Sequence, residues 1–267
     1  MQADFHQRFV SLHQGAEPLL LTNCWDAASA RLWQELGAPA IATSSAAVAW
    51  SRGYSDGGAL PRSVLLDSLR DIVRVTKVPI TVDVENGYSD DPRAVADLVA
   101  DVVDAGAVGI NLEDGTGTPA QLAAKIRAIR ARLDKAPLFI NARTDVYLRK
   151  MATGDAAVGM TIERLETYRA AGADGGFVPF LADVDAATRI AAKVPLALNV
   201  MTMPALPSLT ALRAAGVRRV STGPFLFRVA YGAAQEAAKA FLGGDPASLY
   251  ASSLDGGALN ALFAAPR

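Results

Sequence analysis

The chain has 267 residues, of which 51% are hydrophobic and 20% are charged, and its formal net charge is -1. A single (β/α)8 barrel needs about 250 residues, so residues 1–267 are expected to form one domain. The small net charge and a pI near 6.1 exclude the global basic field that attracts nucleic acid or anionic lipid. We therefore expect a small-molecule partner.

The chain carries no pattern that predicts secretion or a membrane anchor. Cys24 is the single cysteine and cannot form an intramolecular disulfide, which is usual in a reducing compartment. The first ten residues lack the apolar core of a signal peptide, and no segment has the ~18 to 20 consecutive apolar residues of a membrane-spanning helix. A cytoplasmic protein without membrane or nucleic-acid partners is expected.

Short apolar runs recur along the chain, and each precedes a longer segment with helical spacing, some of which begin at capping signals such as Asp26 or Asp91 before Pro92. Eight runs are predicted as strands: 19–24, 40–44, 80–83, 108–112, 138–142, 176–179, 196–200 and 219–222. Most are apolar throughout, which is typical of parallel strands covered on both faces. Eight consecutive units predict a closed (β/α)8 barrel, with an open doubly wound sheet as the alternative.

The C-terminal part is predicted to be helical beyond the barrel. Residues 224–244 have the pattern of a final helix, and residues 242–267 form an appended helical tail with an apolar face. That face has to be buried, and the sequence leaves open whether it caps the barrel or packs on a neighbouring subunit.

Polar residues follow several of the predicted strands. In barrels of this type the carboxyl ends of the strands form the functional rim. The residues expected at this rim are Ser44, Ser45 and Asp56 after the second strand, Asp83 and Glu85 after the third, Glu113 after the fourth, Arg143 after the fifth and Asn199 in the seventh.

Asp83, Glu85 and Glu113 predict a metal site. The first two share one side of a strand by its period of two, and Glu113 comes from the adjacent strand, so three carboxylates would crowd a small space. Oxygen ligands without His or Cys favour Mg2+, with Mn2+ possible. The two histidines, His6 and His13, precede the first strand and are expected at the surface or in end-capping positions.

Arg143 and the two serines each have two interpretations. A guanidinium at the end of an apolar strand predicts a clamp for a carboxylate or phosphonate, or an internal salt bridge to Glu113 or Asp145. Ser44 and Ser45 can donate to a substrate carboxylate, or serve only as turn residues.

Three motifs, TVDVENGY, GINLED and NARTD, follow one another on three successive predicted strands. In this order and spacing the chain resembles the isocitrate lyase/phosphoenolpyruvate mutase superfamily from about residue 20 to residue 222. The resemblance implies the same barrel, Mg2+, and a 2-oxo acid substrate that reacts through an enolate. It also implies a homo-oligomer, a dimer or tetramer, in which a C-terminal helix is exchanged between partners.

The resemblance further implies roles for individual residues. Asp83 resembles the direct Mg2+ ligand, and Arg143 the residue that contacts the substrate carboxylate and the developing enolate. The remaining assignments are water-holding acids at Asp56, Glu85 and Glu113, carboxylate binding at Ser44, Ser45 and Ala46, and the asparagine of the strand-seven motif at Asn199. Among these, Arg143, Glu113 and Asp56 are the residues expected to be catalytic.

The chain also departs from the family pattern. The Lys-Lys-Cys-Gly-His motif of the lyases is absent after Glu113, Phe180 stands where the lyases have a glutamate, and Ala42 stands where the mutases have a tryptophan. Three functions remain open: a Mg2+-dependent lyase of a small 2-oxo or 2-hydroxy acid, by C–C cleavage or decarboxylation; a phosphonopyruvate-type C–P hydrolase or mutase using Thr116 or Thr118; and a non-catalytic barrel that binds a 2-oxo acid and metal.

Overall fold

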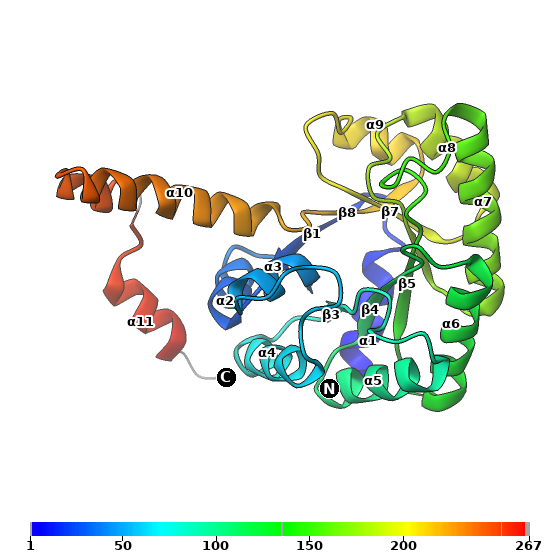
Figure 1. Cartoon of the computed structure of the whole chain (residues 1–267), viewed down its shortest axis with the longest axis horizontal. Coiled ribbons are helices and arrows are strands. Elements are labelled where there is room, and N and C mark those ends of the chain that lie inside the picture. Colours follow the sequence, from blue (N-terminus) through cyan, green and yellow to red (C-terminus); the bar gives the residue numbers. More distant parts are fainter. Residues whose placement is uncertain (1, 135, 252, 265–267) are drawn as a thin grey trace.

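A computed structural model describes residues 2–134, 136–251 and 253–264 of the chain. Eight parallel strands pair in chain order and close into a barrel in which β1 also pairs with β8 (Figure 1). They are β1 Leu19–Cys24, β2 Ile41–Thr43, β3 Ile80–Asp83, β4 Gly109–Glu113, β5 Phe139–Arg143, β6 Gly175–Phe177, β7 Ala197–Met201 and β8 Val217–Ser221. The predicted (β/α)8 barrel is confirmed, and the open sheet is excluded.

Helices surround the barrel in the expected alternation. They are α1 Gln2–Leu12, α2 Ala27–Glu35, α3 Ser45–Ser51, α4 Arg62–Val75, α5 Pro92–Asp104, α6 Pro119–Leu133, α7 Gly154–Ala171, α8 Val184–Lys193, α9 Leu209–Ala214, α10 Phe225–Leu242 and α11 Gly256–Ala264. The predicted start signals are present: the Asp26 carboxylate accepts from Ser29 N–H at 2.7 Å, and Asp91 caps α5 with Pro92 in its first turn.

The amino ends of the strands are closed by α1. Its Phe9 is fully buried against Phe139, the first residue of β5, with ring centroids 5.4 Å apart. His13 stacks on Phe139 at 4.4 Å and contacts Phe9. It is 5% exposed, so of the two predicted places the surface is wrong, and His13 caps the amino end of the barrel with α1. The apolar side chains on the first residues of the strands, such as Leu19, need a cover, and α1 supplies it.

The chain after β8 leaves the barrel. Helix α10 projects away from it, and α11 turns back beside α2, where Arg31 Nε donates to the carbonyl of Leu262 at 3.3 Å (Figure 1). A 3-10 turn, η1 Pro246–Tyr250, lies between them. Residues 252 and 265–267 of the predicted tail lie outside the described residues. Within the part that the structure describes, no helix is long and apolar enough to cross a membrane.

Candidate active site

Asp83 occupies the end of β3 and is 8% exposed. Its backbone N–H donates to Thr43 Oγ1 on β2 at 2.9 Å, and its carboxylate accepts from the Glu85 N–H at 3.0 Å. These two contacts fix the position of the carboxylate relative to both neighbouring segments. No arginine or lysine forms an ion pair with it among the described residues.

Glu85 reaches the site by a turn and not by strand geometry. Its φ of 51° is left-handed, so the prediction that it continues β3 in extended form is wrong. The chain bends because Gly87 N–H donates to the Val84 carbonyl at 2.8 Å. Glu85 is nevertheless buried, and its Oε1 has no hydrogen-bond partner among the described residues. Burying a carboxylate oxygen without a hydrogen-bond partner is energetically unfavourable unless a ligand or metal ion binds it.

Glu113 and Arg143 are partners in the β4–β5 register. Arg143 Nη1 lies 2.6 Å from Glu113 Oε2, and its Nε lies 2.7 Å from Asp145 Oδ1. The internal salt bridges considered from the sequence are therefore present. The remaining nitrogen, Nη2, has no partner among the described residues, so a clamp function through that atom stays a prediction.

The rim carries more negative than positive charge in its interior. Burial raises the pKa of Asp83 and, with Asp83 and Asp56 nearby, raises the pKa of Glu85 to about 7. Burial also raises the pKa of Glu113 to about 8 against the attraction of Arg143. Burial disfavours the charge of Arg143, but the carboxylates of Glu113 and Asp145 raise its pKa, so Arg143 stays cationic. Arg143 thus faces several acids.

The donor set fits a hard divalent cation that keeps part of its water shell. No three His, Cys, Asp or Glu side chains of residues 2–134, 136–251 and 253–264 gather closely enough to hold one ion together. Mg2+ commonly takes one or two protein carboxylates directly and fills its octahedron with water or substrate oxygens. Asp83 and the unpaired Glu85 oxygen meet that requirement.

A cavity of about 190 Å³ opens at the barrel mouth, and it is lined by Asp56, Asp83 and Arg143 together with the predicted carboxylate-binding residues Ser44, Ser45 and Ala46. The serines do not lie in a loop: Ser44 caps α3, and Ser45 begins it. Asp56 is exposed on the long segment between α3 and α4.

Asn199 does not line the mouth cavity. It is fully buried inside the barrel, where its amide donates to the Val200 carbonyl at 2.7 Å and its Oδ1 accepts from Asn141 at 3.1 Å. Strand β7 continues to Met201, whose side chain reaches the cavity instead. The structure therefore does not bring Asn199 to the substrate position expected for it.

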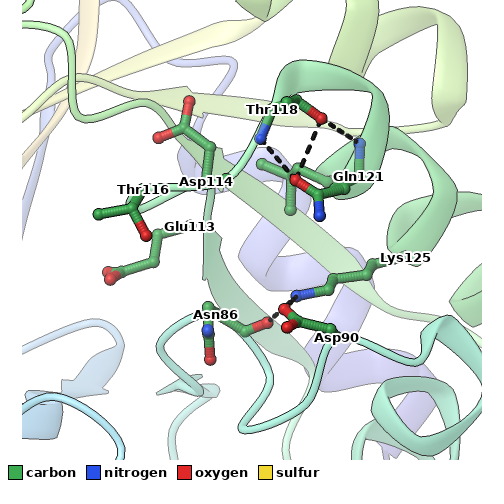
Figure 2. A pocket seen from close by; sticks show the side chains of 10 residues that line it. Asn86, Asp90, Glu113, Asp114, Thr116, Thr118, Gln121 and Lys125 are labelled. Atoms are coloured by element: carbon green, nitrogen blue, oxygen red, sulfur yellow. Dashed lines mark hydrogen bonds and ion pairs between the residues drawn. The ribbon is translucent and has the colours of Figure 1, made fainter.

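A second cavity, of about 200 Å³, lies between the turn after β3 and the loop after β4. Figure 2 shows Glu113, Thr116 and Thr118 on its loop side, and Lys125 Nζ donating to the Asn86 carbonyl at 2.9 Å. Lys125 is buried on α6 and holds the turn that carries Glu85 and Asn86. Glu113 lines this cavity and not the mouth cavity.

The second acid of the GINLED motif has a structural role. Asp114 is buried, and its Oδ2 accepts from Tyr168 Oη at 2.6 Å and from Arg164 at 2.8 Å. Its Oδ1 accepts from the Asp145 N–H at 2.9 Å, which supports the partner of Arg143. Glu113 ends β4 and pairs with Arg143 at the rim, whereas Asp114 follows the strand and is held by Tyr168 and Arg164 behind it.

Sequence reasoning missed several residues of the two cavities. Leu148 and Met201 line the mouth, but apolar residues in a turn or at a strand end give no signal of their function in a sequence. Lys125 could have been found, because it interrupts the buried face of α6 formed by Leu122 and Ile126.

The phosphoenolpyruvate phosphomutase family model matches residues 9–242. The chain belongs to this family. The predicted isocitrate lyase/phosphoenolpyruvate mutase superfamily and its lyase and mutase enzyme type are confirmed.

Its relatives differ in what is known of them. An uncharacterized protein of Mycobacterium tuberculosis (strain H37Rv) is 38% identical over 242 residues, covering 89% of this chain and 90% of that protein. Oxaloacetate decarboxylase of Ectopseudomonas mendocina is 30% identical over 76% of this chain and 72% of its own.

Solved structures support the same assignment. A candidate lyase or mutase from Burkholderia cenocepacia J2315 has a TM-score of 0.90 and 34% identity, covering 99% of this chain and 97% of that one. Phosphonopyruvate hydrolase in complex with oxalate and Mg2+ has a TM-score of 0.84 over 96% and 94% of the two chains, but at 20% identity it shows the fold alone.

Proposed function

We propose that the protein is a Mg2+-dependent lyase of a small 2-oxo or 2-hydroxy carboxylic acid, acting through an enolate by C–C cleavage or decarboxylation. The observation that carries the proposal is the buried carboxylate of Asp83 beside Arg143 in the mouth cavity. Behind it lies the buried Glu85, whose Oε1 has no hydrogen-bond partner among the described residues. Manganese would suit the same oxygen donors.

In this proposal Asp83 holds the metal directly, and Glu85, Glu113 and Asp56 hold water molecules of its shell. Bound Mg2+ supplies Lewis-acid polarisation of the substrate's carboxylate and 2-oxo oxygens. The raised pKa values of the acids support the assignment, because a cation would relieve the repulsion among them.

The mouth cavity has donors for the substrate carboxylate. The first backbone N–H groups of a helix lack intrahelical partners, so those of Ser45 and Ala46 are free to donate, and the Ser44 hydroxyl lies beside them. Arg143 Nη2 is the donor for negative charge that develops on the 2-oxo oxygen. In decarboxylation the electron pair of the broken C–C bond would form the enolate while CO2 leaves, and water at the open mouth would return a proton to carbon. In C–C cleavage of a hydroxy acid, the hydroxyl would give its proton to water, its fragment would leave as a carbonyl compound, and the other fragment would take the electron pair as the enolate.

The experiment is to incubate the purified chain and Mg2+ with a panel of 2-oxo and 2-hydroxy di- and tricarboxylates. Product should form faster than with Mg2+ alone, and EDTA should abolish the difference. If Mg2+ with a 2-oxo acid raises the melting temperature while no product appears on long incubation, the chain is instead a binding barrel.

A C–P hydrolase or mutase is the second candidate, and the match to the phosphoenolpyruvate phosphomutase family favours it. This chemistry would need Thr116 or Thr118 to contact the substrate, but both line the second cavity. The Thr118 hydroxyl also accepts a hydrogen bond from the Gln121 N–H at the start of α6. Phosphorus NMR of an incubation with phosphonopyruvate decides this: loss of the phosphonate signal would establish C–P chemistry.

We also propose a homo-oligomer. Helix α10 has one buried residue, Phe227, whereas Val229, Phe241 and Leu242 are exposed on the projecting segment. Exposed apolar side chains in such number are typical of a surface that a partner covers. Light scattering coupled to size exclusion measures the mass, and a monomer would reject this proposal.

A further inference from the structure

Asn111 contacts the proposed metal site from β4. It is buried, lines the mouth cavity, and is the partner of Asp83 in the β3–β4 register. Burial raises the pKa of Asp83, whereas a hydrogen bond from the Asn111 side chain acts to lower that pKa. Because a carboxylate only accepts hydrogen bonds, the group that Asn111 presents to Asp83 is its amide NH2.

The neighbours of Asn111 decide which way its amide is turned. Its Oδ1 accepts from Arg219 Nη2 at 3.2 Å and from Asn141 Nδ2 at 2.9 Å. Arginine carries donors only, so the Asn111 atom that contacts it has to be the oxygen. The orientation of Asn141 is fixed as well, because its Nδ2 also donates to Asn199 Oδ1 at 3.1 Å. With its oxygen bonded to two donors, Asn111 keeps its NH2 turned toward Asp83.

Arg219 reaches Asn111 across the barrel. Strands β8 and β4 are four places apart in the closed order of eight, so the Arg219 side chain spans the interior from one side to the other. Arg219 is fully buried, and its Nε and Nη1 have no partner among the described residues. A methionine would pack there without the unfavourable burial of a charge. Packing alone therefore does not explain an arginine at this position, whereas the hydrogen bond to Asn111 gives it a role.

The Asp83 carboxylate is held by two donors, the Glu85 N–H at 3.0 Å and the Asn111 NH2. An ionised carboxylate has about four lone-pair positions, so two donors leave others for a cation. A carboxylate that is already held in place does not have to be ordered when the ion binds. Hydrogen-bond partners of metal ligands typically contribute about 10–100-fold to metal affinity for this reason.

We infer that Asn111 is a positioning residue of the metal site: its NH2 holds the Asp83 carboxylate in the geometry that binds Mg2+, and Arg219 and Asn141 keep the amide in that orientation. The inference rests on the proposed function, because it takes Asp83 as the direct ligand of the ion. It adds an uncharged residue of the barrel interior to the acids of the rim.

The test uses Asn111→Leu, which removes the NH2 without changing the charge of the site. Titration calorimetry of the full chain should show Mg2+ binding about tenfold weaker than in the parent, or weaker still. Asn141→Leu is the matched control: it makes the same change in the same hydrogen-bond network, but Arg219 still holds the Asn111 oxygen, so the loss of affinity should be clearly smaller. Equal losses in the two variants, or unchanged affinity in an Asn111→Leu protein that circular dichroism shows to be folded, would overturn the inference.

The parent chain gives a second measurement that does not depend on a variant. In NMR spectra of the chain with isotope-labelled asparagine side chains, the NH2 signal of Asn111 should shift when Mg2+ is added, because the carboxylate that accepts from it becomes a metal ligand. The NH2 signal of Asn260, exposed on α11, is the control and should not move. An Asn111 signal that stays in place at saturating Mg2+ would overturn the inference.

Asp83→Ala separates failure of this inference from failure of the proposed function. If Mg2+ binding survives Asp83→Ala, Asp83 is not the ligand, and both fail. If Mg2+ binding is lost in Asp83→Ala but is unchanged in Asn111→Leu, the positioning role alone fails and the proposed function stands.

Discussion

The two ends of the barrel bury polar groups in opposite ways. At the amino ends of the strands, the His13 ring stacks on Phe139, and its Nδ1 lies 2.8 Å from the Phe9 carbonyl. Burial, together with the charge of Arg219, lowers the pKa of His13 to about 3, so its ring is neutral at physiological pH. At the carboxyl ends, Asp83, Glu85 and Asp145 are buried near the partly exposed Arg143. The amino end is built as a conventional core, whereas the carboxyl end keeps charges that packing alone does not require.

Two arginines inside the barrel show the same contrast. Arg143 at the mouth is held by two carboxylates. Arg219 on β8 is fully buried, its Nη2 donates to Asn111 at 3.2 Å, and its Nε and Nη1 have no partner among the described residues. Burial lowers the pKa of Arg219 to about 9. Mutations of the two arginines should therefore have unlike effects.

The largest effect is expected for Asp83→Ala. Product formation should fall to the rate of Mg2+ alone, and Mg2+ affinity should drop by about a hundredfold or more, because the proposed direct ligand is removed. The fold should remain stable, since a buried carboxylate with a raised pKa is lost. Calorimetric Mg2+ titration measures the affinity, and Asp67→Ala on the exposed face of α4 is the control. Unchanged affinity would show that these acids only balance nearby bases.

Arg143→Met should destabilise the fold by about 3–5 kcal/mol, because Glu113 and the almost fully buried Asp145 lose their partner. Urea unfolding followed by circular dichroism measures this. Arg149→Met, which removes a half-exposed partner of Asp145, should cost less than about 1 kcal/mol. A similar loss of unfolding free energy in the two variants would show that the salt bridges of Arg143 contribute no more to stability than the salt bridge of Arg149.

His13 should make the fold sensitive to acid. Its pKa in the folded chain lies below the ordinary value, so the unfolded chain takes up the proton first, and stability falls as the pH drops from 6.5 toward 3. At pH 5 the loss should be about 2 kcal/mol. His13→Gln should lack this part of the pH dependence in urea unfolding at pH 7.5 and pH 5, whereas His6→Gln should retain it. If both variants lost the same unfolding free energy between pH 7.5 and pH 5, His13 would not be the group responsible.

Arg219→Met should have the smallest effect. Replacing a buried charge that lacks a carboxylate partner with an apolar side chain of similar length should leave the free energy of unfolding within about 1 kcal/mol of the parent or raise it. Chemical unfolding measures this. A loss as large as that expected for Arg143→Met would show that Arg219 has a partner such as buried water, and the contrast between the two arginines would fail.

Much of the fold was predictable because it depends on local patterns. Apolar runs such as residues 80–83 and capping residues such as Asp26 determine where strands and helices begin. The site residues that lie at the ends of strands, such as Asp83 and Arg143, were predictable from the sequence. Glu85 departs from the expected geometry because its backbone is left-handed, and strand periodicity contains no information about such a turn.

The sequence by itself determined the barrel, the family motifs and the acids of the rim, since each depends on residues close together in the chain. Only the tertiary structure decided that Arg143 is shared between Glu113 and Asp145, that Asn199 lies outside the lining of the mouth cavity, and that Phe180 belongs to that lining. These facts depend on which side chains meet across different strands and loops. Those distances are set by the closure of the barrel and the paths of its loops, and no local pattern encodes them.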